Sequence, residues 1–235
     1  MKIAKQALVF VAVSAVFAIG TGVAEKGPLG GAGPLPYGPY TCKPGLVWRE
    51  AVPGDLVCVS SPRRQTVRGD NAQAAARRQP GGGAYGPDTC RVPFVWREAW
   101  PSDHVCVPGA ERDQVRAENA GSVLGLVSPT SVPRGPVSTH NVWRDTNSRD
   151  LEARGSGFSP NGQVVFYGIN SARAGLRTLG SVTADAGGNI GTWTYFETVD
   201  ITTANCQHNP YGIIVADDVR TGKVIGVGEQ KYVCW

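Results

Sequence analysis

One pattern occurs twice in the chain: YGPYTCKPGLVWREAVPGDLVCVSSPRRQTVRGDNA at Tyr37–Ala72 and YGPDTCRVPFVWREAWPSDHVCVPGAERDQVRAENA at Tyr85–Ala120. The two copies are offset by 48 residues, and 20 of the 36 paired positions are identical. Internal duplication at this level identifies each copy as a structural unit. We therefore expect a first cysteine repeat at residues 37–79 and a second at residues 85–120.

Each copy has the pattern of a β-hairpin followed by a helix. Alternating residues around Trp48 have the period of a strand, and the turn at Val52–Asp55 contains proline and glycine. The chain is expected to return as a strand over Leu56–Val59. Ser61 and Pro62 resemble a helix cap and first turn. The helix is expected to end before Pro80–Gly83, which predicts a flexible joint.

The cysteines fit this hairpin. Cys42 and Cys58 fall at its two open ends in the first copy, and Cys90 and Cys106 do so in the second. Six cysteines allow about 15 pairings, but the duplication favours one of them. The predicted disulfides are Cys42–Cys58, Cys90–Cys106 and Cys206–Cys234. Closing a loop of this size stabilises the folded state by about 3 kcal/mol, because it lowers the conformational entropy of the unfolded chain. A unit with few large apolar residues needs that stabilisation.

The N-terminus has the pattern of a secretory signal. Lys2 and Lys5 precede an apolar run from Ala7 to Ile19, and small residues suit cleavage after Ala24. This predicts a signal peptide at residues 1–24, with an uncleaved anchor as the alternative. The run is shorter than the roughly 20 residues of a bilayer span. Its removal lowers the formal charge from +4 to +2, so charge indicates no particular partner.

The last hundred residues have a different texture, with short apolar segments separated by Gly, Asn and Asp. We expect residues 121–135 to be a linker and residues 136–235 to form a β-sandwich of about seven strands. Val142–Asp145 repeats the spacing of Val47–Glu50 and is interpreted as the first strand, with a decayed third repeat as the alternative. The predicted fold is mainly β: two disulfide-stapled hairpin-plus-helix repeats followed by an immunoglobulin-like sandwich.

Two resemblances to known families accompany this reading. The string C-x-x-G-[FL]-V-W-R-E-A-x-P-x-D-x-V-C-V, with an Arg- and Asn-containing stretch after it, resembles a short cysteine module of exported bacterial proteins. The second copy departs from it at Val92-Pro93, so its first strand is expected to begin differently. The strings G-S-G-F-x-P-x-G-x-V, T-A-D-x-x-G-N and A-D-D-x-x-T-G are similar to bacterial immunoglobulin-like modules. The resemblances imply export and modular architecture, and no activity.

Candidate binding residues come from the repeats: Trp48, Trp96, Arg64 and Arg68. An indole beside Arg and Glu can hold a sugar, but Trp48 and Trp96 can equally pack on their disulfides and on Val67 or Val115, and we favour this structural role. The arginines of the first repeat have no interleaved aromatic residues, so a solvated helix face is favoured over nucleic-acid binding.

Nothing in the sequence indicates catalysis. His104, His140 and His208 are the only histidines, and the motifs H-E-x-x-H, G-x-S-x-G and G-x-x-x-x-G-K-[ST] are absent. Asp185 and Asp217-Asp218 lie in predicted turns, which explain them without calcium. We expect no catalytic residue, no metal site and no cofactor. A hydrolase with paired carboxylates remains the least favoured alternative.

The leading hypothesis is a non-catalytic binding or adhesion protein that is secreted, periplasmic or on the cell surface, with a cell-envelope polysaccharide or another surface protein as its partner. A structural envelope or spacer protein is the alternative. Nucleic acid is not expected, nor a membrane span after signal removal. Exposure of several tryptophans on one face would favour glycan binding, and burial of all would favour the structural role. These tryptophans are Trp48, Trp96, Trp100, Trp143, Trp193 and Trp235.

Overall fold

The computed structural model of the chain describes residues 35–170, 175–208 and 211–234. The expected signal peptide, residues 1–24, lies outside the described residues. In the described part, strands outnumber helices, as the sequence predicts, and no helix there is long and apolar enough to cross a membrane.

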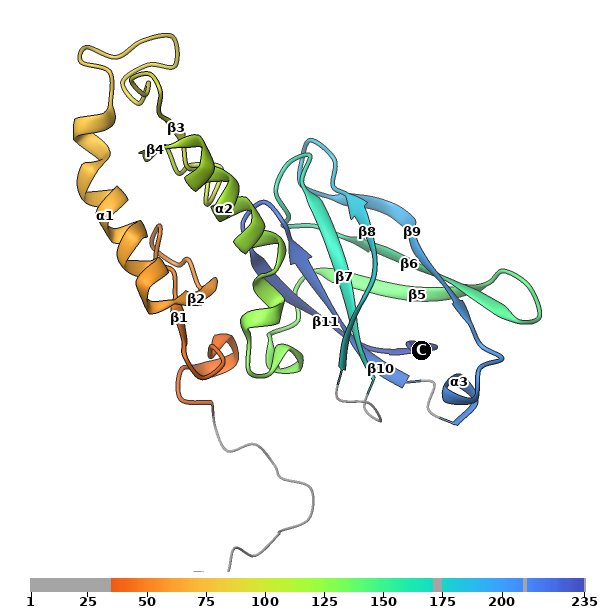
Figure 1. Cartoon of the computed structure of the whole chain (residues 1–235). Coiled ribbons are helices and arrows are strands. Elements are labelled where there is room, and N and C mark those ends of the chain that lie inside the picture. The colour runs from red at the N-terminus through yellow and green to blue at the C-terminus, as the bar shows by residue number, and fades with distance from the viewer. Residues whose placement is uncertain (1–34, 171–174, 209–210, 235) are drawn as a thin grey trace, which may run out of the picture. The chain divides into compact units, whose positions relative to one another are not determined.

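Each repeat folds as an antiparallel hairpin followed by a helix, which confirms the prediction (Figure 1). The two hairpins pair in equivalent registers, with Trp48 opposite Cys58 and Trp96 opposite Cys106. The first repeat contains η1 (Gly38–Tyr40), β1 (Leu46–Trp48), β2 (Cys58–Ser60) and α1 (Ser61–Arg77). The second contains β3 (Val95–Trp96), β4 (Cys106–Val107) and α2 (Gly109–Ala120). The disulfides join Cys42 to Cys58, Cys90 to Cys106 and Cys206 to Cys234.

The start of α1 differs by one residue from the expected cap. Ser60, rather than Ser61, has extended backbone angles, and its side chain accepts a hydrogen bond from the Arg63 backbone N–H at 3.3 Å. Ser61 and Pro62 therefore occupy the first turn, where proline lacks only a donor that would be unpaired anyway.

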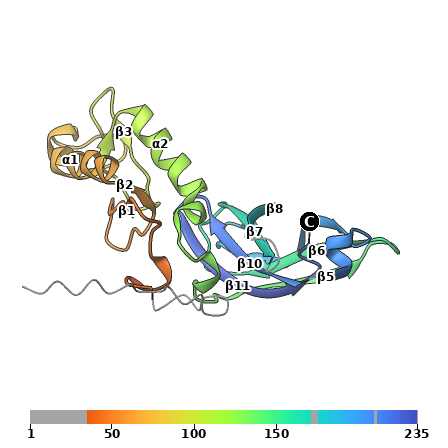
Figure 2. The same cartoon turned by 60° about the horizontal axis from the view of Figure 1, so that its bottom comes forward.

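The two repeats pack into one unit, with α1 and α2 side by side in both views (Figure 1, Figure 2). Val67 from α1 and Val115 from α2 are fully buried in one cluster with Ala51 and Ala99. The glycine-rich joint therefore connects two hairpin–helix units that share a core. Sequence periodicity defines each unit but does not reveal this shared core, because the contacts join residues about one repeat apart.

A reciprocal pair of buried arginines crosses between the repeats. Arg49 donates to Asp55 of its own hairpin and, through Nη2, to Asn119 Oδ1 of α2 at 2.7 Å. Arg97 donates to Asp103 and, through Nη1, to Asn71 Oδ1 of α1 at 2.9 Å. The repeated W-R-E-A string thus supplies the side chain that joins each hairpin to the other repeat's helix.

The expected linker, residues 121–135, packs against the C-terminal region. It contains η2 (Ser122–Gly125) and η3 (Pro129–Ser131), and Val123, Leu126 and Val132 are buried. These side chains cluster with one apolar residue each of β7 (Gln163–Asn170), β10 (Tyr211–Asp218) and β11 (Lys223–Lys231), namely Tyr167, Val215 and Val224. Short 3-10 turns lack the periodic pattern of a helix or strand, so the sequence of this segment resembles a linker.

The C-terminal region consists of two antiparallel sheets around one core. One sheet has the order β5-β6-β9 and the other β11-β10-β7-β8. Apolar residues from all seven strands form a single buried cluster, and Phe166 of one sheet stacks on Phe196 of the other at 4.5 Å. The strands are β5 (Val137–Trp143), β6 (Ser148–Gly155), β7 (Gln163–Asn170), β8 (Gly175–Thr183), β9 (Ile190–Asp200), β10 (Tyr211–Asp218) and β11 (Lys223–Lys231).

Two expectations for this region change in detail. Lys223–Val227 and Gln230–Cys234 are expected as separate strands, but one strand, β11, runs through Gly228 to Lys231. Gly228 has φ 123°, which an L side chain rarely adopts, and it adjoins a bulge of β11, where Val227 is left without a partner between the pairs Ile214–Gly228 and Val215–Gly226. Cys234 is expected in the last strand but follows β11. Cys206 lies in α3 (Ala204–His208), so the third disulfide joins α3 to the segment after β11.

Candidate binding site

Each repeat carries an open pocket beside its tryptophan. The first has a volume of about 310 Å³ and is lined by Tyr37, Cys42, Leu46, Val47, Trp48 and Arg64. The second, of about 350 Å³, is lined by Tyr85, Thr89, Cys90, Phe94, Val95, Trp96, Glu98 and Arg112. A shift of 48 residues places every lining residue of the first pocket on a lining residue of the second. The two pockets therefore occupy equivalent positions in the two repeats, and we call them the repeat pockets.

The hairpin holds the indole of each repeat pocket in one orientation. Trp48 Nε1 donates to the Tyr40 backbone carbonyl at 2.9 Å, and Trp96 Nε1 donates to the equivalent carbonyl of Asp88 at 2.7 Å. These hydrogen bonds fix the edge of each indole and so set the orientation of its ring in the pocket.

A tyrosine contacts each indole edge-on. The ring centroids of Tyr37 and Trp48 are 5.8 Å apart, and those of Tyr85 and Trp96 are 5.4 Å apart. Tyr37 is 70% exposed and Tyr85 is 72% exposed. Side chains so exposed contribute little to a core, yet both copies carry one at the same position. Each tyrosine therefore borders its repeat pocket with most of its surface open to solvent.

An arginine from the first turns of each helix completes the pocket. The Nε atoms of Arg64 and Arg112 are both buried without a hydrogen-bond partner. The closest carboxylate oxygen to Arg64, on Glu50, is 3.8 Å from Nη1, which is beyond hydrogen-bonding distance. In both copies the fold thus leaves the guanidinium with unused donors.

The acid that follows the buried arginine is also placed alike in both copies. Glu50 and Glu98 have φ values of 59° and 58°, a left-handed conformation that costs a non-glycine residue roughly 1–2 kcal/mol. Each carboxylate binds the arginine one helical turn after the pocket arginine: Glu50 contacts Arg68 at 2.8 Å, and Glu98 contacts Arg116 at 2.7 Å.

The structure therefore divides the expected binding residues. Trp48 and Arg64 line the first repeat pocket, and Trp96 lines the second, whereas Arg68 lies outside the lining and pairs with Glu50. Tyr37, Tyr85 and Arg112 are not among the residues expected from the sequence. The available signal for the tyrosines was their position at the head of the repeated frame.

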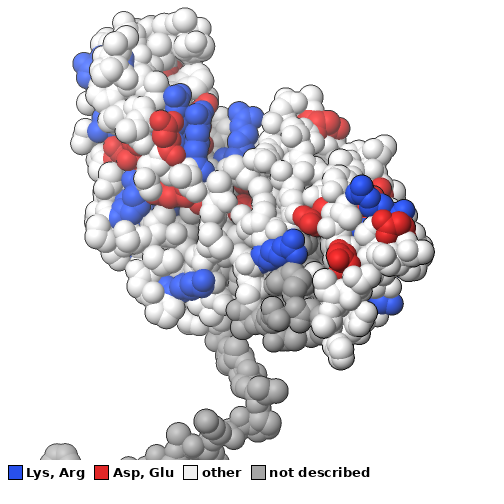
Figure 3. All heavy atoms as spheres, turned by 45° about the vertical axis from the view of Figure 1, so that its right-hand side comes forward, with Lys and Arg blue, Asp and Glu red and all other residues white. Residues whose placement is uncertain are grey.

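The basic run of the first repeat is paired with acids. Figure 3 shows basic and acidic side chains interspersed on the visible face of the molecule. Arg63 binds Glu111 and Glu118, and Arg77 binds Asp70. Arg78 contacts Asp88, as Arg68 contacts Glu50. The arginines of α1 therefore do not form a free stripe of positive charge.

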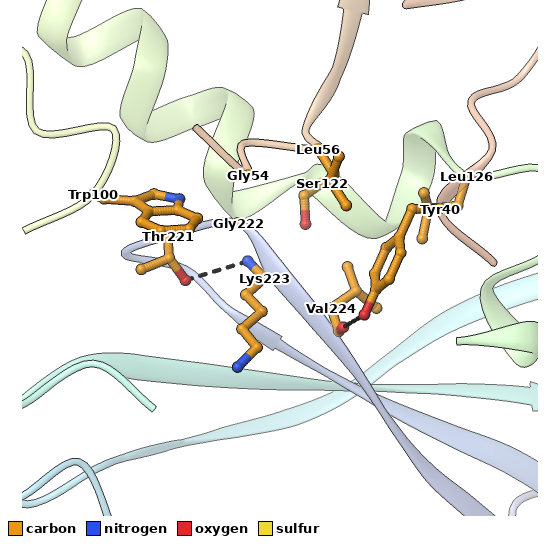
Figure 4. A pocket seen from close by; sticks show the side chains of 10 residues that line it. All are labelled: Tyr40, Gly54, Leu56, Trp100, Ser122, Leu126, Thr221, Gly222, Lys223 and Val224. Carbon is orange, nitrogen blue, oxygen red and sulfur yellow. Dashed lines mark hydrogen bonds between the residues drawn. The ribbon is translucent and has the colours of Figure 1, made fainter. Parts of the chain in front are cut away.

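A smaller cavity, of about 170 Å³, lies between the repeats and the β10–β11 turn (Figure 4). Trp100 and Tyr40 line it, and the Tyr40 hydroxyl donates to the Val224 carbonyl at 3.4 Å. Trp100 stands where the first repeat has Val52, so this cavity has no duplicate. It belongs to the seam at which the repeats pack on the C-terminal sheets.

The tryptophans do not form one exposed row. Trp143 on β5 is 64% exposed and Trp193 on β9 is 37% exposed, while Trp48, Trp96 and Trp100 are partly buried. Trp235 lies outside the described residues. The described tryptophans thus form neither a single exposed row nor a fully buried set. The repeat pockets are therefore the more specific indication of a binding site.

Among the described residues, no group of three or more His, Cys, Asp or Glu side chains is arranged to hold a metal ion. His104 stacks on Trp96 and lies 3.1 Å from Asp88, and His140 lies 3.2 Å from Glu152. Comparison with known proteins finds no matching family model, no matching curated protein and no matching solved structure.

Proposed function

We propose that the chain is an exported, non-catalytic binding protein whose two repeat pockets each hold a saccharide unit of a cell-envelope or extracellular glycan. The observation that carries the proposal is the duplicated, exposed tyrosine beside a fixed indole and an under-bonded arginine. Aromatic faces pack against the C–H face of a sugar, and guanidinium donors bind its oxygens. Pockets with a largely apolar lining and a few convergent polar groups are typical of ligand sites.

Export and the Ig-like assignment belong to the same proposal. Three disulfides suit a chain that works in an oxidising compartment. In the C-terminal region the first, second and fifth strands share one sheet, and the third, fourth, sixth and seventh share the other. Constant-type immunoglobulin domains differ from this only in the sheet that takes the fourth strand. This partition supports an immunoglobulin-like sandwich that displays the repeats.

The test is glycan binding by the full chain and by tyrosine variants. Tyr37→Ala and Tyr85→Ala are each expected to remove one binding site, and the double variant to lose binding at least about tenfold, because an aromatic anchor commonly contributes more than about 1 kcal/mol. Thermal unfolding should change little, since both side chains are exposed. Binding to immobilised glycans and calorimetric stoichiometry measure these effects.

The matched control is Tyr195→Ala, which removes an exposed tyrosine from β9. Binding by this variant should equal that of the unchanged chain. If the Tyr37/Tyr85 double variant binds as well as the unchanged chain, or if the unchanged chain binds no glycan, the proposal is wrong.

A structural envelope or spacer protein is the second candidate function. The buried Arg49 and Arg97 favour it, because each binds an acid of its own hairpin and an asparagine of the other repeat and is closed to solvent. For this function, no glycan should bind, and the tyrosine substitutions should have no effect on any binding assay.

A further inference from the structure

We infer that the repeat pockets select a saccharide that carries an oxyanion, and that one chain holds two such units. This inference rests on the proposed function and names the class of its ligand. It follows from the charge that surrounds the two pockets and from the bonding state of their arginines.

The arginine that lines each pocket is the group left for an anion. Arg112 makes no side-chain hydrogen bond or ion pair with any described residue, and Arg64 has only the distant contact with Glu50. Their buried Nε atoms are unpartnered as well. Because the Nε atoms are buried, a ligand in the pocket is expected to bind the Nη groups, whose bonds to a charged oxygen are stronger than those to a neutral one.

The pocket charge is the same in both repeats although the repeats differ in total charge. Residues Thr41–Arg78 contain seven basic and three acidic residues, and Thr89–Ala120 contain four and five. Around each pocket, however, two arginines and one glutamate leave a net charge of +1. These groups are Arg64, Arg68 and Glu50 in the first copy and Arg112, Arg116 and Glu98 in the second. All three groups are identical in the two copies, so the duplication keeps the pocket charge although the rest of the two repeats differs.

The glutamates divide the two arginines into different roles. Glu50 holds Arg68, and Glu98 holds Arg116, at hydrogen-bonding distance. The outer arginine is therefore neutralised, while the inner arginine makes no hydrogen bond to that glutamate, and its nearest approach is the 3.8 Å contact of Arg64 Nη1 with Glu50. Two parallel N–H donors match the two oxygens of a carboxylate, and they also match those of a sulfate or phosphate ester.

The experiment compares polysaccharides of different charge on the full chain. The probes are polygalacturonate, which carries carboxylates, dextran sulfate, and uncharged dextran. We expect at least about tenfold tighter binding of one anionic polymer than of dextran, with two equivalent sites per chain. The Arg64→Gln/Arg112→Gln double variant should lose this preference. Arg68→Gln/Arg116→Gln, which makes the same change in charge one helical turn further on, should keep most of it.

The binding results separate the inference from the proposed function. Preference for polygalacturonate or for dextran sulfate supports the inference and identifies the oxyanion. Equal loss of binding in both arginine double variants overturns it, because the attraction would then be a general effect of charge. Equal binding of dextran and the anionic polymers also overturns it but leaves saccharide binding intact. Binding of no polysaccharide at all contradicts the proposed function itself.

Discussion

Arg49→Ala is expected to lower the free energy of unfolding by about 3–5 kcal/mol, the cost of breaking a fully buried ion pair. Arg49 is completely buried, and its guanidinium contacts Asp55 at 2.9 Å and Glu118 at 3.1 Å. Without it, the buried Asp55 carboxylate loses its cation, and Asn119 loses a donor. Denaturation in urea, followed by tryptophan fluorescence, measures the loss.

Two further variants test this explanation. Arg97→Ala should cost a similar amount, because Arg97 makes the same contact with Asp103 and reaches across to Asn71. Arg68→Ala removes an ion pair whose side chains are about half exposed, so its cost should be below about 1 kcal/mol. Equal stability of the Arg49→Ala and Arg68→Ala proteins would contradict the stabilising role of the buried contacts of Arg49.

Arg49→Ala should also accelerate reduction of both repeat disulfides. The two repeats share the cluster around Val67 and Val115, so loosening one hairpin exposes the other. Reduction of Cys42–Cys58 alone, with Cys90–Cys106 as resistant as before, would show instead that the repeats unfold separately.

Lowering the pH from 8 to 5 is expected to stabilise the protein through Asp217 by about 3 kcal/mol. Burial raises the pKa of this carboxyl to about 7, against hydrogen bonds from Ser122 and Val123 that lower it. Between pH 3.8 and pH 7 the folded state therefore holds a proton that the unfolded state releases. This stabilisation is present at pH 5 and is lost as the pH rises through 7.

The comparison that isolates this effect is Asp217→Asn against the unchanged chain, by urea denaturation at several pH values from 5 to 8. The variant should be at least as stable at pH 8, because Asp217 Oδ2 is buried without a partner and no ionised group then has to be buried. Its stability should change less with pH. Asp185→Asn is the control, since hydrogen bonds from Asn189 and Gly187 lower the pKa of that exposed carboxyl. An identical pH slope with and without Asp217 would refute the prediction.

The local architecture of the repeats could be predicted because its causes are local. Three features predict the hairpin: the alternation around Trp48, the Pro-Gly turn and the placement of Cys42 and Cys58. They all lie within fewer than twenty residues, and the second copy repeats the alternation and the cysteine spacing. The cap was displaced by one residue, to Ser60, because neighbouring serines have equal capping ability and only the backbone angles distinguish them.

The candidate site could be predicted only in part. Trp48, Trp96 and Arg64 were recognisable from residue type and repetition, but their relation to Tyr37 and Tyr85 depends on how the chain before the first cysteine folds back over the hairpin. The sequence predicts Arg68 and Arg64 equally as binding residues, since both lie on one face of the same helix. Only the position of Glu50 separates them, and its left-handed backbone is invisible to strand periodicity.

Neighbouring residues suffice to predict the secondary structure of each repeat, the disulfide pairs and the mainly β character of the C-terminal region, since turns, alternation and duplication are local features. The packing of the folded chain brings Arg49 to Asn119, 70 residues away, and Ser122 of the expected linker to Asp217, 95 residues away. Such contacts depend on which surfaces of separate elements meet. No local period encodes that choice, because buried polar groups take whichever partners the packing brings within reach.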